Sequence, residues 1–252
     1  MSKTAWCTGA GKGIGRAVAS KLARQGVHVA VSARSGDDLI ALADEARSFG
    51  GTIEAFPVDV TDEAAMRETA GRIEDRLGPL DLVILNAGTH IPDSAATFSV
   101  ESVRTLVETN LMGTVHGLTA VLPRMMERGQ GRMAVVSSVA GYRGLPGAAG
   151  YGATKAALIN LCEALRPELD RAGVDLKLIN PGFVRTPLTD RNDFPMPFLM
   201  EVDAAAERIV RGLDSNRFEV TFPRRFTWML KVLRMLPYGL YFAITRRLVR
   251  PS

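Results

Sequence analysis

The chain has 252 residues with an apolar fraction of 46%, which suits one large α/β domain, and its two cysteines, Cys7 and Cys162, exclude a disulfide framework. Its net charge is +4, and residues 220–252 hold seven Lys or Arg and no acid. The rest of the chain has 24 basic and 27 acidic residues, a net charge of −3. This distribution argues against a nucleic-acid-binding surface. The N-terminal residues lack the apolar segment of a signal peptide, so we expect a cytoplasmic protein.

Predicted strands and helices alternate along the chain. Short apolar runs predict strands at 4–9, 27–33, 52–60, 81–88, 132–141 and 174–182. Helical spacing of apolar residues predicts helices at 14–26, 37–50, 63–78, 100–128 and 151–172. This alternation predicts an α/β Rossmann fold, a doubly wound parallel sheet between two helical layers, with its ligand crevice at the carboxyl ends of the strands. We divide the chain into a domain over 1–223 and a basic, apolar, helical C-terminal extension over 224–252.

A glycine-rich loop follows the first predicted strand. In the stretch TGAGKGIG, residues 8–15, Gly9 permits a tight turn, Gly13 lets the backbone approach a pyrophosphate and Gly15 allows close helix packing. The pyrophosphate would lie at the helix N-terminus, where free N–H groups and the helix dipole favour an anion. Taken alone, the loop is also compatible with an ordinary tight turn.

The residues near the expected adenosine ribose favour NADP(H) over NAD(H). An NAD site usually carries an acid at the end of the second strand, where this chain has Arg34. Lys12 in the glycine loop adds a second cation, and two cations suit a 2′-phosphate. The alternative is that both are solvated surface residues. We expect Asp37 and Asp38 to cap the following helix.

Tyr151 and Lys155 are four residues apart, which places them on one face of a predicted helix. A nearby ammonium and an oxidised nicotinamide would lower the pKa of the phenol, so that Tyr151 could exchange a proton with a carbonyl or alcohol. Ser138, at the end of its strand, would bind the substrate oxygen. By itself such a pair is more often an exposed contact on an amphipathic helix.

Together these motifs resemble those of the short-chain dehydrogenase/reductase family, along roughly residues 3–213. The matching motifs, in the family's order, are the loop at 8–15, Asp59-Val60, Asn86-Ala87-Gly88, Asn110, Ser138, the YxxxK of 151–155, Pro181-Gly182 and Thr186.

The resemblance implies a catalytic tetrad. Tyr151 would be the acid/base, and Ser138 would orient and polarise the substrate oxygen. Lys155 would hold the nicotinamide ribose and lower the tyrosine pKa, while Asn110 would position a water in a proton relay. No metal is implied.

The resemblance also implies an NADP(H) site along the strand ends. Asp59 and Val60 would meet the adenine, residues 86–88 would line the floor, and Val184 and Thr186 would fix the carboxamide. The implied cofactor-binding residues are Gly9, Gly11, Lys12, Gly13, Ile14, Gly15, Arg34, Asp59, Val60, Asn86, Ala87, Gly88, Tyr151, Lys155, Pro181, Gly182, Val184 and Thr186.

The substrate and the assembly are less constrained. Residues 189–200 form an apolar loop stiffened by Pro195 and Pro197, which favours a lipophilic carbonyl or alcohol or else merely covers the core. Its apolar members are Phe194, Met196, Phe198, Leu199 and Met200. The helices at 100–128 and 151–172 are those that the family uses for a homodimer; the long extension puts a tetramer in doubt.

The extension contains two amphipathic stretches separated by Pro237. We expect two helices, each with a basic face: Thr227, Lys231 and Arg234 on the first, and Arg246, Arg247 and Arg250 on the second. The wide apolar faces hold Phe226, Met229, Leu230, Leu233 and Leu236, then Tyr238, Tyr241, Phe242, Ile244 and Leu248. These faces either pack on the body or a partner subunit, or anchor the protein peripherally on the inner surface of a membrane.

Three function classes follow. The first is an NADP-dependent oxidoreductase that transfers a hydride between NADP(H) and a carbonyl or alcohol, and the motifs favour it. The others are a catalytically weak cofactor-binding relative and a scaffold protein at a membrane surface.

Overall fold

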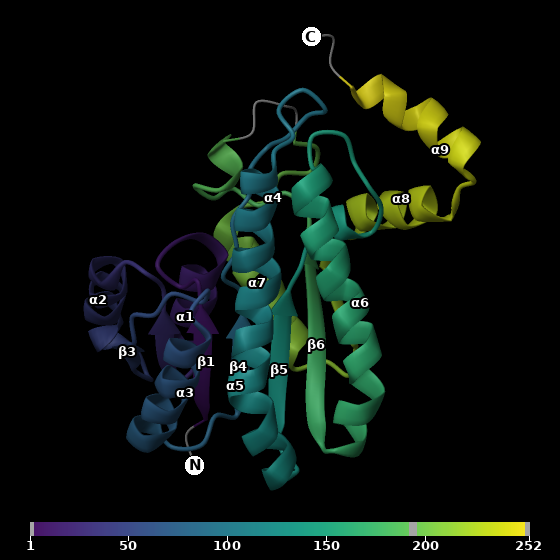
Figure 1. Cartoon of the computed structure of the whole chain (residues 1–252). Helices are drawn as coiled ribbons and strands as arrows, with labels where there is room; N and C mark the ends of the chain where they lie inside the picture. Colours follow the sequence, from purple (N-terminus) through teal and green to yellow (C-terminus); the bar gives the residue numbers. More distant parts are fainter. Residues whose placement is uncertain (1–2, 192–195, 250–252) are drawn as a thin grey trace.

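The computed structural model describes residues 3–191 and 196–249 of the chain. Seven parallel strands form one sheet in the order β3-β2-β1-β4-β5-β6-β7 (Figure 1). The strands are β1 (Thr4–Thr8), β2 (His28–Ser32), β3 (Ile53–Ala55), β4 (Leu82–Leu85), β5 (Gly131–Val136), β6 (Val174–Pro181) and β7 (Glu219–Phe222). The helices are α1 (Gly13–Arg24), α2 (Gly36–Glu45), α3 (Glu63–Leu77), α4 (Val100–Leu106), α5 (Gly113–Arg128), α6 (Ala149–Arg171), α7 (Val202–Leu213), α8 (Arg224–Met235) and α9 (Tyr238–Thr245). The predicted doubly wound Rossmann fold is confirmed.

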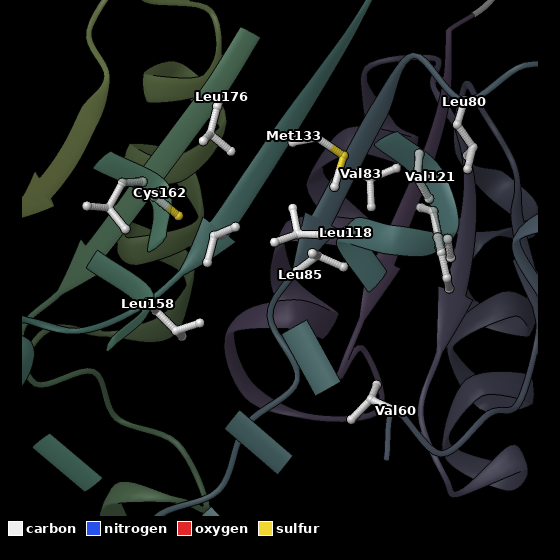
Figure 2. Close-up of a cluster of buried hydrophobic side chains, with 14 of the residues drawn as sticks. Val60, Leu80, Val83, Leu85, Leu118, Val121, Met133, Leu158, Cys162 and Leu176 are labelled. Atoms are coloured by element: carbon white, nitrogen blue, oxygen red, sulfur yellow. The ribbon is translucent and has the colours of Figure 1, made fainter. Parts of the chain in front are cut away.

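Helices cover both faces of the sheet because successive strand residues point to opposite faces. On one face, α1, α2 and α7 bury Cys7, Val31 and Ala134 with their neighbours. On the other, α3, α5 and α6 bury the cluster that Figure 2 shows, in which Val83, Leu118 and Met133 meet between strands and helices. β1, β2, β4, β5 and β6 contribute to both clusters, so the centre of the parallel sheet is buried on both faces.

The predicted elements differ in detail from those in the structure. The predicted strand at 52–60 is shortened to Ile53–Ala55, and Pro57, which follows, cannot donate a ladder hydrogen bond. The predicted helix at 100–128 contains a π-helical segment, Val107–Met112, between α4 and α5. The sequence patterns did not single out α7 and β7, which complete the sheet and its cover.

The extension forms two helices that meet at Pro237, as expected. In Figure 1 both are yellow, and α9 extends away from the sheet. The predicted stripe of Thr227, Lys231 and Arg234 on α8 is directed partly toward the body, because Thr227 is buried and Lys231 forms an ion pair with Glu219 of β7. Met229, predicted on the wide apolar face, is 59% exposed. The helix therefore turns its polar stripe toward the body, where partners for Thr227 and Lys231 exist.

Candidate active site

The glycine-rich loop passes so close to neighbouring backbone that side chains would not fit. An added Cβ at Gly9, whose φ is 65°, would lie 2.7 Å from Ala87 Cα, and one at Gly15 would lie 2.4 Å from the Gly9 oxygen. Gly13 begins α1 with a φ of 58°, and its position is next to Thr186. The buried Gly11 and the half-buried Ile14 complete the turn.

The first turn of α1 is open to an anion. Its N-cap residue, Lys12, makes no side-chain capping bond, and no acid lies in that turn. Uncapped N–H groups at a helix N-terminus, together with the helix dipole, favour a phosphate. The close backbone approaches and this uncapped turn fit a dinucleotide pyrophosphate.

Asn86 and Thr8 join the glycine loop to the end of β4. The Asn86 amide nitrogen Nδ2 donates to the backbone oxygens of Thr8 and Gly9 at 3.1 and 3.2 Å. The Thr8 hydroxyl accepts from the backbone N–H groups of Asn86 and Ala87. The Asn86 side chain thus braces the loop, and Thr8 is a supporting residue that the motif comparison did not single out.

The expected adenosine end of the site contains an acid as well as two cations. Lys12 and Arg34 are both exposed, as a 2′-phosphate site requires, but Lys12 Nζ lies 3.4 Å from Asp38 Oδ2. The expected cap is also different: Ser35 is the N-cap of α2, and its hydroxyl accepts from the Asp38 N–H. Asp38 therefore points its carboxylate toward the glycine loop.

Asp59 and Val60 follow β3 at the same edge of the sheet. The Asp59 carboxylate accepts from the N–H and hydroxyl of Thr61, which orders the turn before α3. Val60 is buried, and its carbonyl oxygen is 2.9 Å from Nδ1 of His116. The turn is therefore held from α5 as well as locally.

Tyr151, Ser138 and Lys155 come together where β5 ends and α6 begins. The Tyr151 phenol is hydrogen-bonded to the Ser138 hydroxyl. Lys155 Nζ lies 5.6 Å from the centroid of the Tyr151 ring and donates to the Val136 oxygen at 3.0 Å. Three of the four predicted catalytic side chains therefore share one small region.

Burial dominates the protonation equilibria of this group. It raises the pKa of Tyr151, against the smaller opposing effect of the Ser138 hydrogen bond. Burial also lowers the pKa of Lys155 to about 8. In the protein without cofactor, burial therefore sets the direction of the tyrosine pKa, and the lowering expected from Lys155 together with the oxidised nicotinamide stays a prediction.

Asn110 lies in the π-helical segment and is fully buried. Its Oδ1 accepts from the Thr89 N–H at 2.7 Å, and its Nδ2 donates to the Thr89 oxygen and the Thr154 hydroxyl. An added Cβ at Gly88 would lie 3.2 Å from Asn110 Oδ1 and 3.6 Å from Lys155 Nζ. Asn110 thus connects the loop after β4 to α6, one turn from Tyr151.

The segment after β6 lies next to Ser138 and to the glycine-rich loop. Pro181 ends β6, and its oxygen is 3.5 Å from the Ser138 hydroxyl. Gly182 donates to the Phe222 oxygen, and Val184 is buried in a bridge with Met200. Thr186 faces Gly13 across the expected cofactor path. Phe194 and Pro195 of the predicted apolar loop lie outside the described residues.

Asp93 is a supporting residue that no sequence pattern indicated. It is buried, and its two carboxylate oxygens accept from the backbone N–H groups of Ala149 and Gly150 at 2.8 and 2.7 Å. These are the first residues of α6, directly before Tyr151. The ring of His90 packs edge-on against that of Tyr151, with centroids 4.8 Å apart. Both partners come from the loop after β4, far away in sequence.

Within residues 3–191 and 196–249, no cluster of His, Cys, Asp and Glu could hold a metal ion. The fold and the site together define a Rossmann-type dinucleotide-binding protein with a serine, tyrosine and lysine at the carboxyl edge of its sheet.

Comparison with known proteins identifies the family. The family model described as short chain dehydrogenase matches residues 3–194, so the chain belongs to the short-chain dehydrogenase/reductase family and is an oxidoreductase of that family. It is 43% identical over 246 residues to an uncharacterized oxidoreductase of Myxococcus xanthus, covering 98% of this chain and 97% of that protein.

Two solved structures show the similarity of the fold. A short-chain dehydrogenase from Sphingobium yanoikuyae in complex with NADPH is 27% identical, with a TM-score of 0.82 over 99% of this chain and 97% of that one. A short-chain dehydrogenase/reductase from Burkholderia phymatum in complex with NAD has a TM-score of 0.85 over 100% and 98%, and at 23% identity it supports the fold alone.

Proposed function

We propose that this oxidoreductase uses NADP(H) to interconvert a lipophilic carbonyl compound and its alcohol. The observation that carries the reaction class is the hydrogen-bonded Ser138–Tyr151 pair beside the buried Lys155. Membership of the family supports it, and nothing in the comparisons favours the alternative of an inactive scaffold protein.

The cofactor would be held by the chain's own groups along the strand ends. The uncapped first turn of α1 and the glycines at 9, 13 and 15 fit the pyrophosphate. The exposed Arg34, and Lys12, which pairs with Asp38 in the free protein, would approach a 2′-phosphate. When bound, the nicotinamide supplies or accepts the hydride. The NADPH named for the Sphingobium protein agrees with this assignment.

The proton is handled by Tyr151. Its raised pKa keeps the phenol protonated at neutral pH, so it can donate to the oxygen of a carbonyl that is being reduced. The Ser138 hydroxyl would hold the same substrate oxygen. Lys155 keeps a positive charge below about pH 8, which favours the phenolate that remains after donation. In the direction of alcohol oxidation the same groups act in reverse.

The substrate side is apolar. Phe198 is 47% exposed, and its ring lies 6.0 Å from that of Phe226, which in turn lies 5.6 Å from Phe183. Phe183 and Phe198 belong to the segment between β6 and α7, which also carries the predicted carboxamide contacts, and Phe226 comes from α8. An apolar wall of this kind suits a hydrophobic carbonyl compound.

The test is a screen of carbonyl compounds with NADPH, followed by the variant Tyr151→Phe. We expect cofactor binding to be nearly unchanged and kcat to fall by roughly 10²-fold or more, the scale of losing a general acid. Lys155→Ala should weaken cofactor binding as well. Near-wild-type turnover by Tyr151→Phe would remove the tyrosine from the mechanism.

Cofactor choice has its own test. Arg34→Asp should lower NADPH affinity by about 2–4 kcal/mol, because repulsion replaces a charge-assisted contact, and should affect NADH far less. Equal kcat/KM of the wild-type enzyme for NADH and NADPH would contradict the NADP assignment while leaving the reaction class intact.

The proposal extends to assembly and location. α4 and the π-helical segment pack against α6 (Figure 1), and these elements lie within the predicted helices at 100–128 and 151–172 that the family resemblance assigned to a homodimer. We expect a cytoplasmic homodimer through this layer, and light scattering at two protein concentrations measures it.

A further inference from the structure

The extension carries most of the exposed large apolar side chains in the described part of the chain. Ten of the fifteen large apolar side chains that are exposed within the described residues lie between Trp228 and Val249. On α8 they are Trp228, Met229, Val232 and Met235, at the spacing of one helical face, and Met235 is 83% exposed. On α9 they are Tyr238, Leu240, Phe242 and Ile244. We call these eight residues the tail surface.

The orientation of the tail surface is set by contacts on the opposite side of α8. Phe226 and Thr227 are buried, and Lys231 pairs with Glu219 of β7. Glu219 also accepts from Tyr142 and from Asn180 Nδ2, so the pair belongs to a polar network within the body. The face that carries Trp228 and Met235 is therefore directed away from the body.

A second clamp holds the bend between the helices. Arg143 Nη1 lies 2.9 Å from the Leu233 oxygen and 2.7 Å from the Leu236 oxygen, at the C-terminus of α8. Its guanidinium carbon lies 3.9 Å from the ring centroid of Tyr241, a buried residue of α9. The tail surface is thus presented by fixed helices and is not an unpacked tail.

The charge around the tail surface selects the partner. Arg224, Arg225, Arg234, Arg246 and Arg247 are exposed, and residues 220–252 contain no acid. A second copy of the chain pairing through this surface would bring arginines against arginines, because a twofold interface sets the same patch against itself. An anionic partner with an apolar interior satisfies both the arginines and the apolar side chains.

We propose that the tail surface docks on an anionic phospholipid bilayer, with α8 and α9 lying in the interface. Amphipathic helices that combine aromatic and aliphatic side chains with arginines bind bilayers in this manner. No helix within the described part of the chain is both long and apolar enough to cross a membrane. The proposal does not depend on the oxidoreductase reaction, because lipid binding is measured without turnover.

Trp228 provides a direct signal. The chain has two tryptophans, and the other, Trp6, is fully buried in the core with its Nε1 donating to Ser32. We expect phosphatidylcholine vesicles with phosphatidylglycerol to sediment the full-length protein and to shift Trp228 emission to the blue. The variant Trp228→Phe should remove the shift. The wild-type protein should bind pure phosphatidylcholine vesicles at least about tenfold more weakly than the anionic vesicles, since each arginine near an anionic surface adds attraction.

Point variants test whether vesicle binding depends on the tail surface or on any exposed apolar or charged residue. The double variant V232D/M235D should lower vesicle affinity at least about tenfold, because two charged side chains would replace apolar ones that enter the bilayer. Ile40→Asp, at a residue of α2 that is 55% exposed, is the matched control and should bind normally. R246Q/R247Q should weaken binding to anionic vesicles, whereas R67Q/R211Q, which also removes two exposed charges, should not.

Several outcomes would overturn the proposal. One is the absence of sedimentation with any vesicle, and another is equal binding to neutral and anionic vesicles. Concentration-dependent self-association that V232D/M235D abolishes, without vesicle binding, would assign the surface to a second copy instead. If the wild-type protein binds no vesicles but reduces carbonyl compounds normally, the lipid proposal is overturned and the proposed oxidoreductase function still stands.

Discussion

Asp93 accepts a 2.7 Å hydrogen bond from the backbone N–H of Gly150, the residue before Tyr151. A buried carboxylate at this point satisfies the free N–H groups of the first turn of α6 and complements the helix dipole. The same bonds determine where the helix begins, and therefore where the Tyr151 phenol lies relative to Ser138. Asp93 is thus a positioning residue for the acid/base.

Replacing Asp93 by Ala should lower both stability and kcat. Loss of an N-cap typically costs about 0.5–2 kcal/mol, and a displaced Tyr151 should reduce kcat by about tenfold with a smaller change in KM for the cofactor. Asp93→Ser, which keeps a capping oxygen, should recover part of the loss. Steady-state kinetics and thermal unfolding measure the two effects.

Asp62→Ala is the matched control, because Asp62 caps α3 with a carboxylate bond to the Ala65 N–H. It should lose similar stability and keep kcat. An equal fall of kcat in both variants would make the effect of Asp93 merely structural.

Replacing either of two buried lysines, Lys155 and Lys177, should change the free energy of unfolding, but in opposite directions. Lys155 loses solvation on burial and has its pKa lowered to about 8, so its charge costs stability in the free protein at pH 7. Lys155→Met should therefore raise the free energy of unfolding by about 2–3 kcal/mol, measured by urea denaturation without cofactor. Lys177, equally buried, pairs with Asp175 and donates to two carbonyl oxygens. Lys177→Met should destabilise, because it leaves those partners unsatisfied.

The Lys155 effect has a defined pH window. Between about pH 8 and the ordinary lysine pKa of 10.5, the unfolded chain retains a proton that the folded chain has released. Stability from this group therefore rises with pH across that window, and the advantage of Lys155→Met should shrink there. A difference between the two proteins that is constant from pH 7 to pH 10 would contradict the lowered pKa.

Asp38 should weaken the preference for NADPH in the wild-type enzyme. Its carboxylate neutralises part of the Lys12 charge and would face a 2′-phosphate. Asp38→Asn should raise kcat/KM for NADPH by about two- to fivefold, the scale of an exposed ion pair, with little change for NADH. Glu45→Gln is the control, since Glu45 pairs with Arg16 at the far end of the same helix. Equal gains with both cofactors would remove Asp38 from the ribose site.

Arg143 should control the local stability of the extension. Arg143→Ala removes the hydrogen bonds at the end of α8 and the contact with Tyr241. Backbone amides of α9 should then exchange hydrogen about tenfold faster or more, while those of β5 and β6 stay unchanged. Arg47→Ala, which removes an 81% exposed arginine of a surface pair, should leave exchange in α9 unaltered. Unchanged exchange in the Arg143 variant would mean that other contacts hold α9.

The sequence alone was sufficient for the fold class and for the proximity of Tyr151, Lys155, Ser138 and the glycine loop. The period of a helix places Tyr151 and Lys155 together, and a parallel sheet brings the ends of its strands to one edge, so Ser138 and the glycine loop had to lie near them. Pro237 likewise divides the extension into two helices because its ring cannot continue one. These conclusions depend on local spacing and on strand order, both of which can be read along the chain.

Only the tertiary structure decided which side chains, far apart in the sequence, meet around the site and beneath the extension. Asp93 caps a helix that begins 56 residues later, Asp38 reaches Lys12 across two loops, and Lys231 turns inward to Glu219. The helical spacing of polar residues in α8 is the same whether that stripe faces the body of the protein or faces water. The choice depends on partners such as Glu219, which reach that position through sheet register, and a polar group is stable inside a protein only where such a partner exists.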